Sequence, residues 1–183
     1  MRILDVSPRV VFPPRRGSGV RTYNILRHLS ARHEIRQFSY ARPAQRPTSR
    51  SDQTVWITPS YLEYRFFSGI GTAVSELGER TWVSAPVLSG VALRLVRPTL
   101  LREWLRWADV TLIEFPWLFD LCRRAHPSGR FVLATHNVEA QKFRSYAAAV
   151  GTPWTTAPWV RFIAPPFRKR GILCGLSRLK TRP

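Results

Sequence analysis

The sequence predicts an α/β fold in which helices flank a parallel sheet. The first 40 residues run strand, glycine-rich loop, amphipathic helix, strand, which is the order of a βαβ unit. Two further apolar runs, residues 109–115 and 130–135, recur later, and a helical pattern follows each. With 183 residues, 44% of them hydrophobic, the chain is long enough to bury the core of one such domain.

The first βαβ unit is read from residues 2–40. Residues 2–7 (RILDVS) form a short apolar strand that ends at Pro8. A helix is expected from about Gly19 to Arg32, and residues 35–40 form the second strand. The helix is predicted from apolar residues at helical spacing: Val20, Tyr23, Ile25, Leu26 and Leu29.

The middle of the chain gives weaker signals. Residues 41–54 are polar and contain two prolines, which indicates an exposed loop, and residues 55–57 form a short third strand. Residues 60–107 show helical patches separated by glycine and proline. The clearest amphipathic helix there is marked by Leu100, Leu101, Trp104, Leu105 and Trp107.

The last elements follow the same alternation. Residues 109–115 form a buried strand, residues 116–124 a helix and residues 130–135 a further strand. Another helix is expected to begin at residues 136–139. We expect one domain over residues 1–163, followed by a basic, poorly ordered tail over residues 164–183.

The charge balance is strongly basic. Lys and Arg number 29 against 11 Asp and Glu, for a formal net charge of +18. A surface of this kind suits phosphates in a nucleotide ligand, a nucleic acid or an anionic lipid. An arginine-rich composition with no partner remains an alternative. Residues 141–183 contain no acid and nine basic residues: Lys142, Arg144, Arg161, Arg168, Lys169, Arg170, Arg178, Lys180 and Arg182.

Cysteine content and hydropathy exclude two further classes of protein, disulfide-rich or zinc-knuckle domains and membrane-spanning proteins. Cys122 and Cys174 are too few for a disulfide framework or a metal knuckle, and Cys122 is expected to be a buried free thiol. The most apolar stretch, residues 85–101, carries Arg94 and Arg97, so no membrane span is predicted. We expect a cytoplasmic protein without a metal or other cofactor, with peripheral contact at the inner membrane face left open.

A ligand site is predicted where the parallel strands end. Residues 15–21, 114–117 and 135–139 follow three of the strands, so they should meet at the carboxyl edge of the sheet. In the first segment, Gly17 and Gly19 let the backbone approach a ligand. The helix that follows presents free N–H groups to an anion.

Arginines flank this loop and complete a candidate diphosphate cradle. Arg15 and Arg16 precede the glycines, and Arg21 lies in the first turn of the helix. The alternative is a glycine-relieved turn with solvated arginines. A dinucleotide fingerprint is disfavoured, because Thr22 replaces its third glycine and the second strand supplies no acid for a ribose.

Three segments together resemble glycosyltransferase family 4. Residues 13–29 (PPRRGSGVRTYNILRHL) resemble the glycine-rich loop and "YNLL" helix of that family, and residues 109–118 (DVTLIEFPWL) its "DVVxxExPW" strand and turn. Residues 135–141 (THNVEAQ) resemble its "TxHNVE" segment. The matches keep the family's order and cover about residues 1–163.

The resemblance implies a GT-B architecture, with this chain as its N-terminal half, a single Rossmann-like domain on the acceptor side. It implies retaining transfer of a sugar from a nucleotide-sugar donor to a glycan, lipid-linked or small-molecule acceptor, without a required metal. His136 would be the catalytic histidine of the cleft. Binding of the donor diphosphate or the acceptor would fall to Arg16, Gly17, Ser18, Gly19, Arg21, Glu114, Asn137 and Glu139.

Several of these residues also have ordinary structural roles. Asn137 or Thr135 can cap a helix, with Glu139 in its first turn, and Glu114 can simply face water at a strand end. The family's second domain, which supplies most donor contacts, has no counterpart after residue 163. We therefore expect a truncated product whose isolated chain lacks transferase turnover.

The alternative function is a non-catalytic basic module that binds nucleic acid or anionic membrane. Its support is the net charge and the basic tail. A basic–aromatic helix containing Arg94, Arg97, Arg102 and Arg106 could lie at a membrane surface, which is compatible with the transferase hypothesis as well, and the alternative is a packed helix with solvated arginines. Against nucleic acid, the chain contains no nucleic-acid-binding motif.

Overall fold

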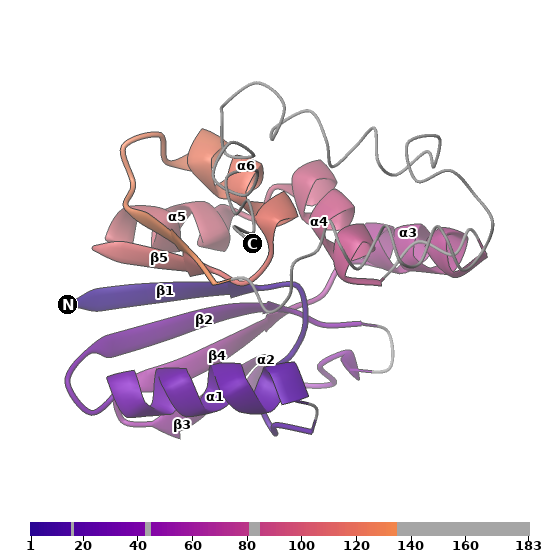
Figure 1. Cartoon of the computed structure of the whole chain (residues 1–183). Coiled ribbons are helices and arrows are strands. Elements are labelled where there is room, and N and C mark those ends of the chain that lie inside the picture. The colour runs from indigo at the N-terminus through magenta and orange to yellow at the C-terminus, as the bar shows by residue number, and fades with distance from the viewer. Residues whose placement is uncertain (16, 43–44, 81–84, 135–183) are drawn as a thin grey trace, which may run out of the picture. The chain divides into compact units, whose positions relative to one another are not determined.

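The fold is built on a six-stranded sheet of order β3-β4-β2-β1-β5-β6 (Figure 1). The computed structural model describes residues 1–15, 17–42, 45–80 and 85–134, all within the unit Met1–His136. The strands are β1 (Arg2–Ser7), β2 (Glu34–Tyr40), β3 (Thr54–Thr58), β4 (Tyr61–Phe66), β5 (Val110–Ile113) and β6 (Phe131–Leu133). The helices are α1 (Gly17–Leu29), α2 (Arg50–Gln53), α3 (Gly69–Arg80), α4 (Ala85–Val96), α5 (Thr99–Trp107) and α6 (Pro116–Ala125).

Five of the strands are parallel, in the order β4-β2-β1-β5-β6, and β3 pairs antiparallel with β4 at one edge. The chain runs outward from β1 to β2 and β4, then returns to place β5 beside β1 before it runs outward to β6. This is the strand order of a Rossmann-like sheet, and it confirms the predicted fold class. The order reverses between β1 and β5, where ligands bind in sheets of this kind.

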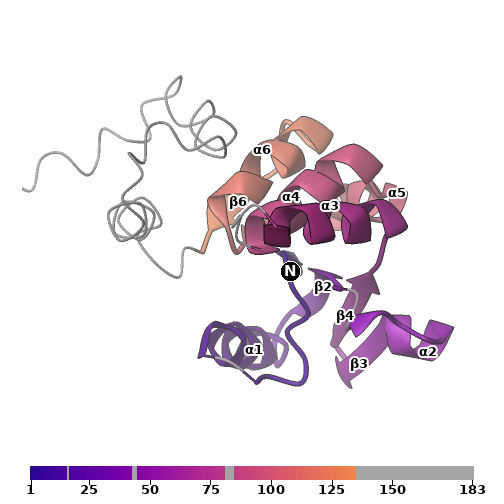
Figure 2. The same ribbon diagram turned by 90° about the vertical axis from the view of Figure 1, so that its right-hand side faces the viewer.

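Helices cover both faces of the sheet (Figures 1 and 2). On one face, Leu26 of α1 packs with Ile3, Ile35 and Tyr61 of three adjacent strands. On the other face, the ring of Trp104 in α5 contacts the rings of Phe38 and Tyr64 edge-on. Because side chains alternate along each strand, residues 3, 5 and 7 of β1 face α1 and residues 4 and 6 face α5.

The first helix begins earlier and faces differently from the prediction. It spans Gly17–Leu29, and its buried residues are Gly19, Thr22 and Leu26. Two residues assigned to its apolar face are substantially exposed, Val20 at 39% and Ile25 at 44%. The buried residues in the first half of the helix, Gly19 and Thr22, are therefore small or polar, and not the apolar residues that the spacing predicted.

Two elements were missed in the middle of the chain. Tyr61–Phe66, within the stretch expected to be helical, is β4, and Arg50–Gln53, within the expected loop, is α2. Strand β4 has no apolar alternation to reveal it, because Glu63 occupies a fully buried position facing α1. The boundary predicted at residue 163 lies outside the described residues.

Cys122 is buried and unpaired, as predicted, and burial raises the pKa of its thiol to about 12. No helix within residues 1–15, 17–42, 45–80 and 85–134 has the length and hydropathy needed to cross a membrane.

The contact between α3 and β2 leads to a first prediction. A Cβ built on Gly71 collides with Tyr40 Oη and lies 2.6 Å from Tyr40 Cζ, and Tyr40 is almost fully buried. Gly71→Ala is therefore expected to lower the free energy of unfolding by about 1–3 kcal/mol in urea denaturation. Gly69→Ala in the same helix is the control, because its Cβ meets nothing within 4 Å. Equal urea midpoints for the two variants would contradict this packing.

Candidate functional site

The candidate site lies at the carboxyl ends of β1 and β5, and one hydrogen bond ties its two halves together. Thr22 Oγ1, in α1, donates to Glu114 Oε1, which directly follows β5, at 2.6 Å. Both residues are 3% exposed. The Glu114 backbone N–H also donates to the Val6 carbonyl of β1 at 3.3 Å. Segments 92 residues apart in sequence thus form one local structure.

The loop after β1 is held in place by a buried carboxylate of β4. Glu63 Oε1 accepts hydrogen bonds from the Val11 N–H at 2.7 Å and from Ser39 Oγ at 2.7 Å. The Phe12 N–H lies 3.3 Å from Glu63 Oε2. Arg65 connects the loop to the carboxylate. Its Nε donates to Glu63 Oε2 at 3.3 Å, and its Nη2 donates to the Phe12 carbonyl at 2.7 Å. The backbone entering α1 is therefore positioned by side chains of β4.

A second buried chain of polar groups crosses the same face. Gln37 Nε2 donates to Asp5 Oδ2 at 2.8 Å, and Tyr61 Oη donates to Gln37 Oε1 at 2.6 Å. Burial raises the pKa of Asp5 well above its usual value, and the nearby negative charge of Glu114 adds to the effect. Burial also raises the pKa of Glu63, although the Val11 N–H and the Ser39 hydroxyl oppose it.

Ser7, the last residue of β1, completes this layer. It is fully buried, and its Oγ has no hydrogen-bond partner among the residues that the structure describes. Buried hydroxyls are normally hydrogen-bonded in folded proteins. The Ser7 hydroxyl is therefore a buried polar group at the carboxyl end of β1 that has no hydrogen bond to another described residue.

The glycines of the predicted cradle are not required by crowding. A Cβ on Gly17 meets nothing within 4 Å, and one on Gly19 lies at an ordinary 3.9 Å from the Val11 carbonyl. Neither glycine has a backbone that excludes other residues. Packing within the described residues therefore requires a glycine at neither position. Arg15 and Arg21 are exposed, and Ser18 is half-buried at the start of α1.

The remaining predicted residues divide into two groups. Glu114 does not face water, contrary to the structural alternative, because α1 covers it and Thr22 donates to it. Trp117 is buried, as expected for a packing residue, and stacks on Phe115 with ring centroids 4.8 Å apart. Arg16, His136, Asn137 and Glu139 lie outside the described residues, so their roles stay predictions.

Four residues of this site are not predicted from the sequence: Asp5, Gln37, Glu63 and, in its role as a donor, Thr22. Asp5 could have been predicted as a buried polar residue, because it is an acid inside an otherwise apolar strand. In the sequence Thr22 signals only a departure from a dinucleotide fingerprint, whereas in the structure its hydroxyl donates to Glu114. In the described ranges, no group of three or more His, Cys, Asp or Glu side chains could hold a metal ion.

No family model and no curated protein sequence matches the chain. Among solved structures, it is similar to "Trehalose-6-phosphate from E. coli bound with UDP-2-fluoro glucose", at 19% identity and a TM-score of 0.46 over 73% of this chain and 32% of that chain. This chain spans about a third of that structure's length. It is also similar to sucrose-phosphate synthase from Thermosynechococcus elongatus, at 11% identity and a TM-score of 0.24 over 82% of this chain and 97% of that chain. The fold assignment rests on the strand order, and the site rests on the hydrogen bonds described above.

Proposed function

We propose that the chain is the N-terminal, acceptor-side domain of a retaining glycosyltransferase of the GT-B type. It would take part in moving a sugar from a nucleotide-sugar donor to a glycan, lipid-linked or small-molecule acceptor. The observation that carries the proposal is the hydrogen bond from Thr22 to Glu114. It lies at the switch point of the sheet, the place between β1 and β5 where the strand order reverses. It joins two of the three segments that resemble family 4 at the edge where such sheets bind ligands.

The start of α1 has the chemistry to receive the donor diphosphate. The first turn of a helix leaves backbone N–H groups without intrahelical partners and carries a partial positive charge. The exposed guanidinium groups of Arg15 and Arg21 flank this turn. A diphosphate placed here would meet donors from the backbone and from arginine, the side chain best suited to phosphate.

The other residues complete the proposal. Gly17, Ser18 and Gly19 would bring the backbone against the diphosphate, together with Arg16. Glu114, fixed by Thr22, would shape the site and bind an acceptor hydroxyl. His136 would act at the transferring sugar, with Asn137 and Glu139 beside it. Because the resemblance implies that a second domain supplies most donor contacts, we expect residues 1–183 alone to bind without turnover.

The direct experiment is a calorimetric titration of the full chain with UDP-, GDP- and ADP-sugars. We expect saturable binding of one of them, and Arg21→Gln is expected to weaken it about fivefold, while Arg27→Gln leaves it unchanged. The alternative of a basic binding module would instead show nucleic acid or anionic vesicle binding that falls steeply with salt and no saturable nucleotide-sugar binding. That result would overturn the proposal.

Thr22→Val gives a structural prediction for the same site. Valine keeps the shape of threonine but leaves the buried Glu114 carboxylate without this donor. We expect a loss of about 1–3 kcal/mol in the free energy of unfolding, measured in urea, and weaker nucleotide-sugar binding. Thr48→Val is the matched control, because the Thr48 hydroxyl donates to Asp52 at the same 2.6 Å on the exposed surface. An equal loss in both variants would contradict a special role for Thr22.

A further inference from the structure

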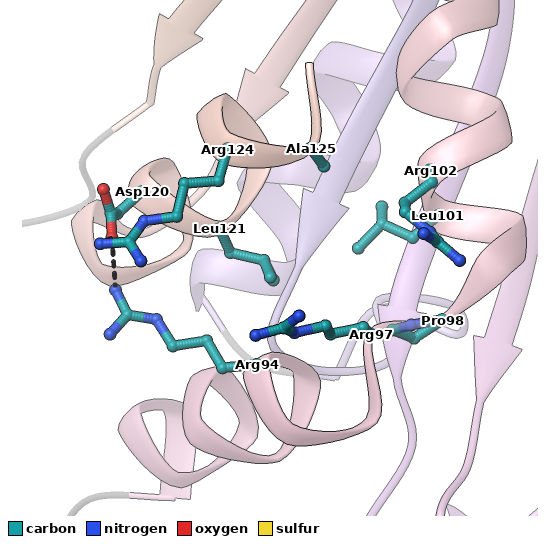
Figure 3. A pocket seen from close by; sticks show the side chains of 9 residues that line it. All are labelled: Arg94, Arg97, Pro98, Leu101, Arg102, Asp120, Leu121, Arg124 and Ala125. Atoms are coloured by element: carbon teal, nitrogen blue, oxygen red, sulfur yellow. Dashed lines mark hydrogen bonds and ion pairs between the residues drawn. The ribbon is translucent and has the colours of Figure 1, made fainter. Parts of the chain in front are cut away.

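A second feature of the molecule is a pocket among α4, α5 and α6 (Figure 3). Its volume is about 350 Å³, within the range of small-ligand sites. These helices cover the face of the sheet opposite α1 (Figure 2), so the pocket is separate from the candidate site at α1. Its lining residues are Arg94, Arg97, Pro98, Leu101, Arg102, Asp120, Leu121, Arg124 and Ala125.

The charges of this pocket do not balance. Four of the lining residues are arginines and one is a carboxylate, and a single oxygen, Asp120 Oδ2, accepts from both Arg94 Nη2 at 3.4 Å and Arg124 Nη2 at 2.9 Å. Arg97 and Arg102 form no side-chain hydrogen bond or ion pair with another residue of the described ranges. Two guanidinium groups thus remain available to an anion at the pocket.

The backbone at Arg97 is unusual for an arginine. Its φ is +48°, in the left-handed region that favours glycine, and its N–H closes the end of α4 on the Leu93 carbonyl at 2.9 Å. Glycine is the common residue at this position of a helix end. The Arg97 side chain extends from this turn across the pocket toward Leu121 (Figure 3). Strained backbone of this kind often marks a functional site.

The pocket has firm walls. Of the residues that line it, Pro98 and Leu101 are buried. Helices α4 and α6 pack tightly beside it, since a Cβ on Gly90 would lie 2.8 Å from Trp117 Cδ1. Leu121 and Ala125 add an apolar side to the charged one. The arrangement suits a ligand with one strongly anionic group and a small apolar or neutral remainder.

We propose that this pocket binds a phosphate monoester, with Arg97 and Arg102 as its principal ligands and Arg94 and Arg124 beside them. Planar guanidinium groups donate paired hydrogen bonds to phosphate oxygens, and a dianion would offset the excess positive charge. The same chemical group occurs on small phosphorylated metabolites and on the headgroup of phosphatidic acid. The proposal is independent of any sugar transfer at the α1 site.

Arg97→Gly provides an unusually clean test. Glycine suits a φ of +48°, so this variant removes the guanidinium while its melting temperature should stay equal or rise. Titrating the full chain with inorganic phosphate at constant ionic strength, we expect Arg97→Gly and Arg102→Gln each to weaken binding about tenfold. Arg27→Gln removes the same charge from an exposed position on α1 and should bind phosphate as the unchanged protein does. Phosphate binding that is absent, or equally affected by all three variants, would overturn the proposal.

Two further arms identify the source of the phosphate group. Saturable binding of glycerol 3-phosphate that is lost in Arg97→Gly supports a soluble ligand. Flotation with phosphatidic acid vesicles but not with phosphatidylcholine vesicles, also lost in Arg97→Gly, supports a lipid headgroup. If neither glycerol 3-phosphate nor phosphatidic acid vesicles bind, the proposal for this pocket is overturned. The proposal for the α1 site does not depend on that result.

Discussion

Replacing Glu63 by alanine is expected to lower the free energy of unfolding by about 3–5 kcal/mol, because it breaks a buried, charge-assisted network. The substitution leaves the Val11 N–H, the Ser39 hydroxyl and the Arg65 guanidinium without their shared acceptor. Since the same carboxylate positions the loop entering α1, nucleotide-sugar binding at that loop is expected to be lost as well. Urea denaturation and calorimetric titration measure the two effects.

Glu34→Ala is the matched control for Glu63→Ala. Glu34 forms an ion pair with Arg36 at 3.1 Å, but its side chain is 51% exposed, whereas that of Glu63 is fully buried. An exposed pair of this kind contributes about 1 kcal/mol or less. If Glu63→Ala proved no more harmful than Glu34→Ala, the loop would not depend on the buried carboxylate.

Asp5→Asn is expected to stabilise the protein at neutral pH and to remove part of its pH dependence. Burial raises the pKa of Asp5 in the folded state, so over the range between its unfolded and folded pKa values the folded protein binds more protons than the unfolded one. Stability then falls as pH rises through that range. Asparagine cannot ionise, and its side-chain oxygen can still accept the hydrogen bond from Gln37 Nε2.

The measurement is the urea midpoint of both proteins from acidic to neutral pH. The unchanged protein should lose stability relative to Asp5→Asn as pH rises. Asp109→Asn should show the opposite sign, because hydrogen bonds from Arg2 lower the pKa of the exposed Asp109. Parallel pH profiles for Asp5→Asn and the unchanged protein would show that Asp5 does not titrate as its burial implies.

The sequence was sufficient for the strands that consist of apolar runs, such as Arg2–Ser7 and Val110–Ile113, and for the helix Thr99–Trp107. It was insufficient for β4, where Tyr61 and Glu63 occupy the buried positions that apolar residues usually hold. It also misjudged the buried face of α1. That face is chosen by tertiary contacts with Glu114 and the sheet, which local periodicity does not contain.

The candidate site was predicted at the strand ends, but the buried polar groups that hold its segments in place were not predicted. The loop and Glu114 could be placed by topology alone, because parallel strands end at one edge. Their partners could not, since Thr22 and Glu114 are 92 residues apart and Val11 and Glu63 are 52 residues apart. A sequence pattern shows which residues are polar, but it does not show which of them become buried together.

The most direct measurement is hydrogen–deuterium exchange of the full chain with and without the nucleotide-sugar that calorimetry selects. The proposed function predicts slower exchange in residues 8–22 and 114–118, with no change in α4 and α5. Protection confined to the α4–α6 pocket, or absent from residues 8–22 at a saturating concentration, would contradict a sugar-donor site at the switch point of the sheet.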